Sequence, residues 1–216
     1  MNIEFILKEL PFMLQGSVMT IELTVLTLSI GTFLGIILAL LKISGVKIFY
    51  YIATFYTWVF RGTPLMLQLF FFYYALPSMG VTLNAFSAAI IGLSLNCAAY
   101  MAEIIRGGIL SIDKGQFEAS KALGYTYFQT MAKIILPQTI RIIIPPVGNE
   151  FISMIKDTSL VSTIAMVELM RTATQISSTT FKYTEILFTA AVLYLLMTTV
   201  FTAAFSALEK KLSIYV

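Results

Sequence analysis

Long apolar runs with almost no charged residues constrain this chain more than any other feature of its sequence. The run LTVLTLSIGTFLGIILALL at residues 23–41 carries no charge, and Arg61 is the one charged residue between positions 48 and 102. At about 1.5 Å per residue, a helix over 23–41 is about as long as the hydrocarbon layer of a membrane is thick. Hydrophobic residues make up 58% of the chain and charged residues 12%, which excludes a soluble domain. The sequence predicts an all-α integral membrane protein with a single transmembrane domain over residues 1–216.

Breaks in the apolar runs divide the chain into five predicted transmembrane helices, at residues 16–41, 55–76, 84–106, from about 140, and 186–208. The first follows an interfacial segment at residues 1–14. The sequence Arg61-Gly62-Thr63-Pro64 should separate an interfacial helix, which carries Trp58, from the main second span. Pro145, Pro146 and Gly148 predict an interruption early in the fourth span, and residues 171–184 are expected to form a polar loop.

The basic residues predict how these helices are oriented. Five spans put the two termini on opposite sides of the membrane, and one side then holds Lys42, Lys47, Lys114, Lys121, Lys133, Arg141, Lys210 and Lys211. The other side holds Lys8, Arg171 and Lys182. Because lysine and arginine are enriched in cytoplasmic loops, we expect the N-terminus outside the cell and the C-terminus in the cytoplasm.

Several kinds of chemistry are excluded by what the sequence lacks. It has no histidine, and its one cysteine, Cys97, lies in an apolar run, so neither a metal centre nor a disulfide is expected. No phosphate-binding G-x-x-x-x-G-K-[ST] motif is present, so the chain is not expected to bind or hydrolyse ATP itself. The net charge of +3 does not suggest nucleic acid. We expect no enzyme activity and no cofactor in this chain.

The stretch 111–137, SIDKGQFEASKALGYTYFQTMAKIILP, is the most polar segment between the long apolar ones. Asp113 with Gln116, and Thr126 with Gln129, each have the spacing of a helix capping box. Gly124 lies between the two pairs and is suited to a left-handed turn. The stretch therefore predicts two short helices outside the membrane, joined by a sharp bend, the second reaching the end of the stretch.

The sequence motif in this stretch is more specific than its helix-capping residues. Glu118-Ala119-Ser120, three residues, Gly124, nine residues and then Ile134-Ile135-Leu136-Pro137 closely resembles the EAA loop of ABC importer permeases, with Ser120 in place of the second alanine. Further runs at 61–65 with Gln68, and at 102–108, 148–151 and 156–160, resemble the polar amino acid branch of these permeases. The resemblance covers nearly the whole chain. It implies the type I permease fold, with five transmembrane helices and a cytoplasmic coupling-helix pair.

The same resemblance implies a function and a set of partners. The chain would be the permease subunit of an ATP-binding-cassette importer in the inner or plasma membrane of a prokaryotic cell, taking up a polar amino acid by alternating access. Its partners would be ATPase subunits, which bind ATP and magnesium, a second permease chain, identical or not, and an extracytoplasmic solute-binding protein. The residues expected to couple to the ATPase are Phe117, Glu118, Ala119, Ser120, Ala122, Leu123 and Gly124.

Polar residues inside the predicted spans are candidates for the substrate pathway, because burying them is costly unless they are paired or face a cavity. Asn96, Tyr100 and Glu103 recur at i, i+4 and i+7 and share one face of the third helix. The same stripe would fit a seam of hydrogen bonds between helices, and Arg106 lies within pairing reach of Glu103. The full candidate set is Glu22, Trp58, Gln68, Asn96, Tyr100, Glu103, Asn149, Thr158, Ser159 and Ser162.

Three alternatives to a polar amino acid importer stay open at this stage. One is an ion-coupled secondary amino acid transporter that uses Glu22 or Glu103 as a proton relay, another a membrane scaffold that transports nothing, and the third a permease for methionine or another small solute. The capped helix pair favours the ATP-driven importer. Within the spans, the glutamates favour a cationic amino acid, unless Glu103 pairs with Arg106 and Glu150 with Lys156.

Overall fold

The computed structural model describes residues 2–212, and no strand occurs within that range. The helices are α1 (Ile3–Ile43), α2 (Lys47–Gly62), α3 (Leu65–Phe70), α4 (Ala85–Leu110), α5 (Lys114–Ala122), α6 (Tyr127–Thr130), α7 (Leu136–Asp157), α8 (Leu169–Thr180) and α9 (Tyr183–Leu212). Two π-helical turns continue α3 (Phe71–Ala75) and α6 (Met131–Ile135), and 3-10 segments cover Leu76–Met79 and Thr158–Ile164. The all-helical prediction is confirmed.

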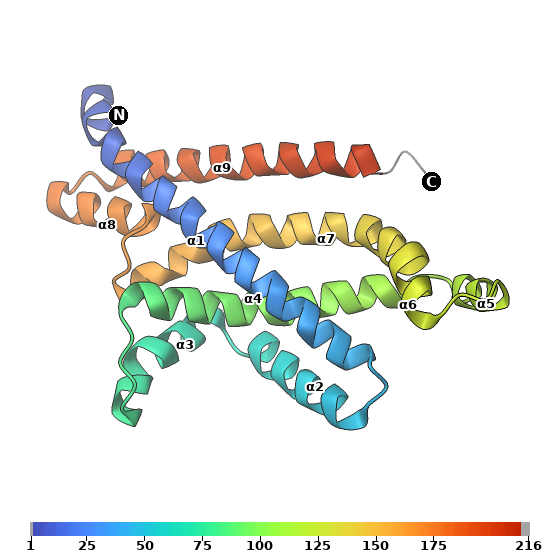
Figure 1. Ribbon diagram of the computed structural model, residues 1–216. Coiled ribbons are helices and arrows are strands. Elements are labelled where there is room, and N and C mark those ends of the chain that lie inside the picture. The colour runs from blue at the N-terminus through green and yellow to red at the C-terminus, as the bar shows by residue number, and fades with distance from the viewer. Residues whose placement is uncertain (1, 213–216) are drawn as a thin grey trace.

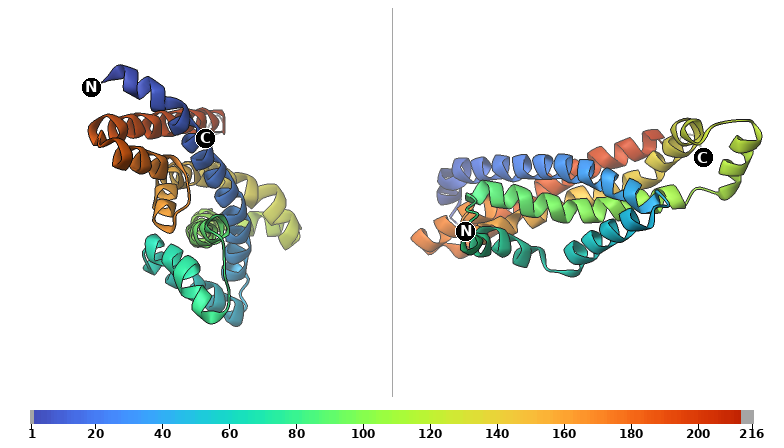
Figure 2. Two further views of the ribbon diagram at one scale, coloured as in Figure 1. Left: turned by 90° about the vertical axis from the view of Figure 1, so that its left-hand side faces the viewer. Right: turned by 60° about the horizontal axis from the view of Figure 1, so that its bottom comes forward.

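Helix α4 lies at the centre of the bundle, with α1, α2, α3 and α7 around it, as the view along α4 in Figure 2 shows. Its close contact with α1 depends on glycine. A Cβ atom on Gly31 would lie 2.6 Å from the sulfur of Cys97, and one on Gly35 would lie 2.6 Å from the Cβ of Met101. Small residues four apart thus let α1 approach α4 closely, as they do in many membrane helix pairs.

Three helices are long and apolar enough to cross a membrane by length and composition alone, namely α1, α4 and α9. The other two predicted spans are realised differently. The segment Leu65–Met79 is a shorter apolar helix, and α7 has 22 residues with two prolines inside it.

The segment predicted to be interfacial leads into the first span without a break, because from Ile3 onward the two form one helix. Helix α1 has 41 residues, begins at a cap in which Asn2 accepts a bond from the backbone of Phe5, and passes through Pro11 without ending. At 1.5 Å per residue α1 is about 60 Å long, roughly twice the thickness of the hydrocarbon layer. Its first turns therefore extend beyond the membrane as part of the same helix.

The predicted break near Pro64 is confirmed, and it makes the single span expected at 55–76 wrong. Helix α2 ends at Gly62, Thr63 is extended, and α3 begins after Pro64. Trp58 lies on α2, on the side of the break predicted for the interfacial helix.

The predicted interruption at Pro145, Pro146 and Gly148 is wrong, because all three lie inside the continuous helix α7. The helix loses its regular form later, at the 3-10 segment Thr158–Ile164, which ends at Ala165 in a left-handed conformation. The second short helix of the 111–137 stretch likewise does not stop at Pro137. The chain stays helical from α6 through a π-helical turn into α7, where proline is tolerated in the first turn.

The polar loop predicted at 171–184 is wrong, because most of it is helix α8. Leu169, Ala173 and Ser177 are buried and recur every four residues. This period of one helical face is visible in the sequence, although the many threonines and serines around it obscure it.

The ends of the bundle differ in what they carry. Figure 1 places the N-terminus and α8 at one end, and α5, α6 and the C-terminal end of α9 at the other. The termini therefore lie at opposite ends, as an odd number of spans requires. Helices α5 and α6 extend beyond the neighbouring helices in Figure 2.

Candidate functional site

The helix pair α5–α6 is built by local signals at both ends. Asp113 accepts a bond from the backbone N–H of Gly115 at 2.6 Å, while the return bond predicted from Gln116 is not among the hydrogen bonds of the described residues. Thr126 and Gln129 form the predicted capping box, with bonds of 3.3 and 2.9 Å. Gly124 has φ of +80°, the predicted left-handed turn.

One side of this pair is held by the protein. The hydroxyl groups of Ser120 and Thr130 lie 2.9 Å apart and join α5 to α6, and both residues are buried. Phe117 packs against the buried cluster that contains Ile112, Met131 and Ile135. Phe117 and Ser120, both among the residues expected to couple to the ATPase, therefore hold the pair in place.

The other side is open. Glu118, Ala119 and Ala122 are exposed on α5, and Leu123 is 77% exposed. Beyond the bend, Tyr127 and Phe128 on α6 are 69% and 79% exposed. Leu123, Tyr127 and Phe128 thus form an apolar knob around Gly124 at the end of the molecule. Tyr127 and Phe128 were not among the residues predicted to couple to the ATPase, although both belong to the 111–137 stretch.

Asn96 and Gln68 meet at the break between α2 and α3. The amide of Gln68 donates to the carbonyl of Phe60 at 2.9 Å and to the carbonyl of Thr63 at 3.1 Å. The amide of Asn96 donates to the carbonyl of Phe60 and to the side-chain oxygen of Gln68, both at 3.0 Å. These two side chains thus satisfy carbonyl groups that the end of α2 leaves without helical partners. The geometry matches the hydrogen-bond seam.

The rest of the polar stripe on α4 also faces α1 and α2. Glu103 forms an ion pair with Lys42 of α1 and accepts two bonds from Arg106, at 2.8 and 3.0 Å. The ring of Tyr100 lies 5.3 Å from the guanidinium carbon of Arg61. The predicted pairing of Glu103 with Arg106 is confirmed. Lys42 was predicted only as a basic residue on the cytoplasmic side, since its position at the end of an apolar run does not reveal that its side chain is buried.

The other candidate pathway residues lie apart from this stripe. Thr158 is fully buried and bonds to the carbonyl of Ile155, while Ser159 and Ser162 are half-buried in the same 3-10 segment. Asn149 lines a groove between α7 and α9, Glu22 is exposed on α1, and the side chain of Trp58 is 70% exposed on α2. The ten candidates therefore do not converge on one cavity within this chain.

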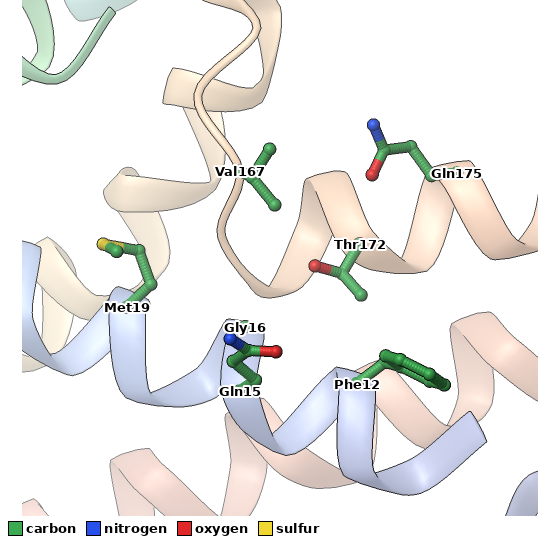
Figure 3. Close-up of a pocket in the computed structure, with 7 residues that line it drawn as sticks. All are labelled: Phe12, Gln15, Gly16, Met19, Val167, Thr172 and Gln175. Atoms are coloured by element: carbon green, nitrogen blue, oxygen red, sulfur yellow. The ribbon is translucent and has the colours of Figure 1, made fainter. Parts of the chain in front are cut away.

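A cavity of about 400 Å³ opens between α1 and α8 instead, and Figure 3 shows its lining from both helices. Phe12, Gln15, Gly16 and Met19 come from α1, and Val167, Thr172 and Gln175 come from α8 and the turn before it. Beside it, the buried carboxylate of Glu168 accepts bonds from the N–H groups of Met170 and Arg171 and, at 2.8 Å, from the hydroxyl of Tyr194. Glu168 therefore fixes the start of α8 against α9.

Comparison with known proteins decides the family. Residues 31–214 match the family model described as "Binding-protein-dependent transport system inner membrane component". The chain belongs to this family. The arginine transport system permease protein ArtQ of Bacillus subtilis (strain 168) is 43% identical to this permease, with 98% of each chain covered. The L-cystine permease protein TcyB of the same organism is 40% identical, covering 95% of this chain and 88% of the relative.

A solved structure agrees with this assignment over the whole bundle. The crystal structure of an amino acid ABC transporter with histidines contains a chain that is 39% identical, with a TM-score of 0.93 and 98% and 99% of the two chains covered. An inward-facing MetNI methionine ABC transporter chain has a TM-score of 0.73 at 19% identity and shares the fold alone. The type I importer permease fold is thereby confirmed.

These findings fix what kind of subunit the permease is. It is a multi-pass membrane subunit of an ABC importer and not an enzyme, and ATP hydrolysis belongs to a separate subunit. Membership also implies an ATPase partner and a second permease chain. The ion-coupled secondary transporter and the membrane scaffold are therefore set aside.

Proposed function

We propose that this permease takes up a polar amino acid, with a preference for a cationic one, through conformational changes driven by the ATPase partner. The observation that carries the proposal is the exposed knob of α5–α6 at one end of the bundle, joined to α4 by residues 111–113 and to α7 by the π-helical turn Met131–Ile135. Relatives named for arginine, cystine and glutamine transport support a polar amino acid as the cargo.

The carboxylates that lack partners favour a cationic cargo. Glu103 is neutralised by Lys42 and Arg106. Glu150 and Asp157, on α7, form no ion pair or side-chain hydrogen bond within residues 2–212. The pairing considered for Glu150 with Lys156 is absent, because residues six apart on a helix lie about 120° apart around its axis and about 9 Å apart along it. The charge of Arg61 acts on Glu150 and that of Lys156 on Asp157, but neither cation is in ion-pair contact, so these two half-buried carboxylates remain available to a further positive charge.

The partners are assigned to the two ends of the bundle. The ATPase, with its ATP and magnesium, docks on α5–α6 in the cytoplasm, where the C-terminus also lies. The solute-binding protein delivers the amino acid to the outer end, which carries the N-terminus and α8. The second permease chain is either a copy of this one or a related chain, and membrane lipid surrounds the pair.

The connections of α5–α6 explain how docking would drive transport. Three residues, 111–113, join α4 to α5, and the π-helical turn Met131–Ile135 joins α6 to α7 without a break. Ile112, Met131 and Ile135 share one buried cluster, so the pair is not free to swing independently of α4 and α7. Closure of the ATPase against the knob would therefore shift α4 and α7 together.

Reconstitution of the permease with its ATPase and binding protein in liposomes tests the proposal. We expect uptake of labelled arginine only with ATP, with competition by lysine and histidine stronger than by glutamine, and none by glutamate or methionine. Preferential competition by glutamate would overturn the cationic preference, and preferential competition by methionine would overturn the polar cargo. Uptake that persists without ATP and follows an ion gradient would overturn the ATP-driven mechanism itself.

A further inference from the structure

A buried group of charges joins three helices at the end of the bundle nearest α5. Lys42 at the end of α1 pairs with Glu103 of α4 and also donates to the hydroxyl oxygen of Thr57 on α2, at 2.7 Å. The side chain of Lys42 is 6% exposed, that of Glu103 18% and that of Arg106 34%. Buried charges in a membrane protein are costly, so a cluster that only packed helices together could be replaced by apolar residues at lower cost.

The cluster lies where α1, α2 and the half of α4 nearest α5 come together. Farther from it, α1 and α4 are already joined by close packing at Gly31 and Gly35. Helix α2 has no such packing with α4, because only Ala53 and Thr57 of its residues are buried. Its links to α4 are polar contacts: a 2.7 Å bond from the hydroxyl of Tyr56 to the carbonyl of Leu95, the bond of Asn96 to the carbonyl of Phe60, and the contact of Arg61 with the ring of Tyr100. Nearest α5, α2 is linked to α4 through Lys42 of α1, which donates to Thr57 and pairs with Glu103.

The position of Glu103 along α4 indicates how a motion of α5–α6 would reach these contacts. Glu103 lies seven residues before the end of α4, and only residues 111–113 separate that end from α5. Ile105 and Ile109, on the same stretch of α4, pack with Ala39 of α1 and with Met131 after α6. A displacement of the α5–α6 pair therefore reaches the end of α1, at Ala39 and Lys42, and Glu103 of α4, before it reaches α2.

We propose that Lys42, Glu103 and Thr57 are positioning residues that clamp α2 to the inner end of α4, so that α2 follows the coupling helices during transport. The proposal rests on the proposed function, because it concerns the motion that ATP drives. It assigns the clamp, and no contact with the amino acid, to Glu103.

The test is the number of amino acids imported per ATP hydrolysed by reconstituted complexes carrying the wild-type ATPase. We expect Glu103→Gln to lower this ratio at least tenfold, since it breaks the clamp and leaves the ammonium of Lys42 buried without its carboxylate. In the double variant Lys42→Met/Glu103→Gln the unpaired buried cation is gone, so we expect the melting temperature to recover while the ratio stays low. A double variant with the wild-type ratio would overturn the clamp, whatever its melting temperature.

A matched pair of threonines supplies the second measurement. Thr57→Val removes the acceptor of Lys42, whereas Thr27→Val changes an equally buried hydroxyl on α1 that has no hydrogen-bond partner. We expect the first to lower the ratio about threefold or more and the second to leave it unchanged, and equal ratios would overturn the clamp. The wild-type complex separates the two proposals. If it shows no ATP-dependent uptake, the proposed function is wrong. If it transports and Glu103→Gln has the same ratio of amino acids imported per ATP, only the clamp is wrong.

Discussion

The chain bends sharply at Gly124 and again at Thr63–Pro64, and the two bends are stabilised in different ways. At Gly124 the backbone turns in the open, with φ of +80° and no atom within 4 Å of where a Cβ would be. At Thr63–Pro64, Gly62 and Pro64 are exposed and Thr63 is half-buried, but the buried amides of Gln68 and Asn96 reach the bend and take up the carbonyl groups that α2 leaves free. A bend that water can solvate needs only a permissive residue, whereas carbonyl groups that face the interior of a membrane bundle need dedicated side-chain partners.

This difference explains why the two bends suit different tasks. The side chains around Gly124 make few contacts with their own chain beyond Ser120 and Phe117, which leaves the knob free to bind a partner. The side chains around Thr63 are already occupied by backbone groups of α2. We therefore expect substitutions at the first bend to affect assembly with the ATPase, and substitutions at the second to affect the stability of the permease.

The largest effect is expected at the exposed bend. Gly124→Val forces a branched side chain into a left-handed conformation at a cost of about 1 kcal/mol or more, and presents that side chain to the partner. Glu118→Lys reverses an exposed charge on the same helix. We expect both variants to insert normally and remain monodisperse in detergent while ATPase affinity, measured by co-purification and titration, falls at least tenfold.

A second glycine provides the control for backbone strain. Gly80 has φ of +85° and equally open surroundings, in the turn before α4 at the other end of the bundle (Figure 1). Gly80→Val should therefore cost similar strain and leave ATPase affinity unchanged. Equal loss of ATPase affinity in Gly80→Val and Gly124→Val would show that backbone strain alone weakens the complex. Wild-type ATPase affinity in both Gly124→Val and Glu118→Lys would show that α5–α6 is not the docking site.

The bend at Thr63–Pro64 should respond most strongly to loss of the buried Gln68. Gln68→Leu keeps most of the side-chain volume and leaves the carbonyl of Thr63, and partly that of Phe60, without a side-chain donor. An unsatisfied buried polar group costs about 1–3 kcal/mol, so we expect the melting temperature of the purified complex to fall by several degrees. Gln138→Leu is the matched control, because its amide bonds only to the carbonyl of Ile134 in its own helical segment. Equal shifts for the two glutamines would contradict the role given to Gln68.

Asn96→Ala should have a smaller effect of the same kind. The amide of Gln68 remains in place to bond to Phe60, so the loss should be about 1 kcal/mol, typical of one hydrogen bond between membrane helices. Ser94→Ala on the same helix removes a buried hydroxyl that has no partner and should be neutral. Measuring transport per assembled complex separates the two roles considered for Asn96. Normal turnover with lower stability identifies a hydrogen bond between helices. Lost turnover at normal stability would place Asn96 on the substrate pathway.

The contrast between the bends also shows what the sequence could predict. Gly124 and the Thr126–Gln129 capping box were predicted correctly because their effect is local: the backbone conformation follows from a few neighbouring residues. The contact of Asn96 with Gln68 joins residues 28 apart, and that of Lys42 with Glu103 joins residues 61 apart. No periodicity reveals such pairs, so Lys42 was treated only as a basic residue on the cytoplasmic side. The family resemblance supplied the overall fold, which local signals alone did not determine.

Pro145 and Pro146 give the sharpest case of a local signal that tertiary packing overrides, and the smallest expected effect. Both lie inside α7, although neither can donate a helical hydrogen bond to the carbonyl four residues earlier. Packing against α4 and α9 keeps the helix continuous: a Cβ on Gly148 would lie 3.0 Å from the ring of Phe205, and Ile143 lies against Gly108. If packing holds α7, then Pro145→Ala or Pro146→Ala restores one backbone donor without altering the path of the helix. We expect the melting temperature to stay the same or to rise by the equivalent of about 1 kcal/mol, the usual net value of one hydrogen bond.

Val147→Ala on the neighbouring position, measured in parallel, reports what loss of packing alone costs and should lower the melting temperature. A proline variant that is clearly less stable than wild type would show that α7 depends on the shape of the proline rings, and that Pro145–Pro146, like Thr63–Pro64, is a bend stabilised by its surroundings.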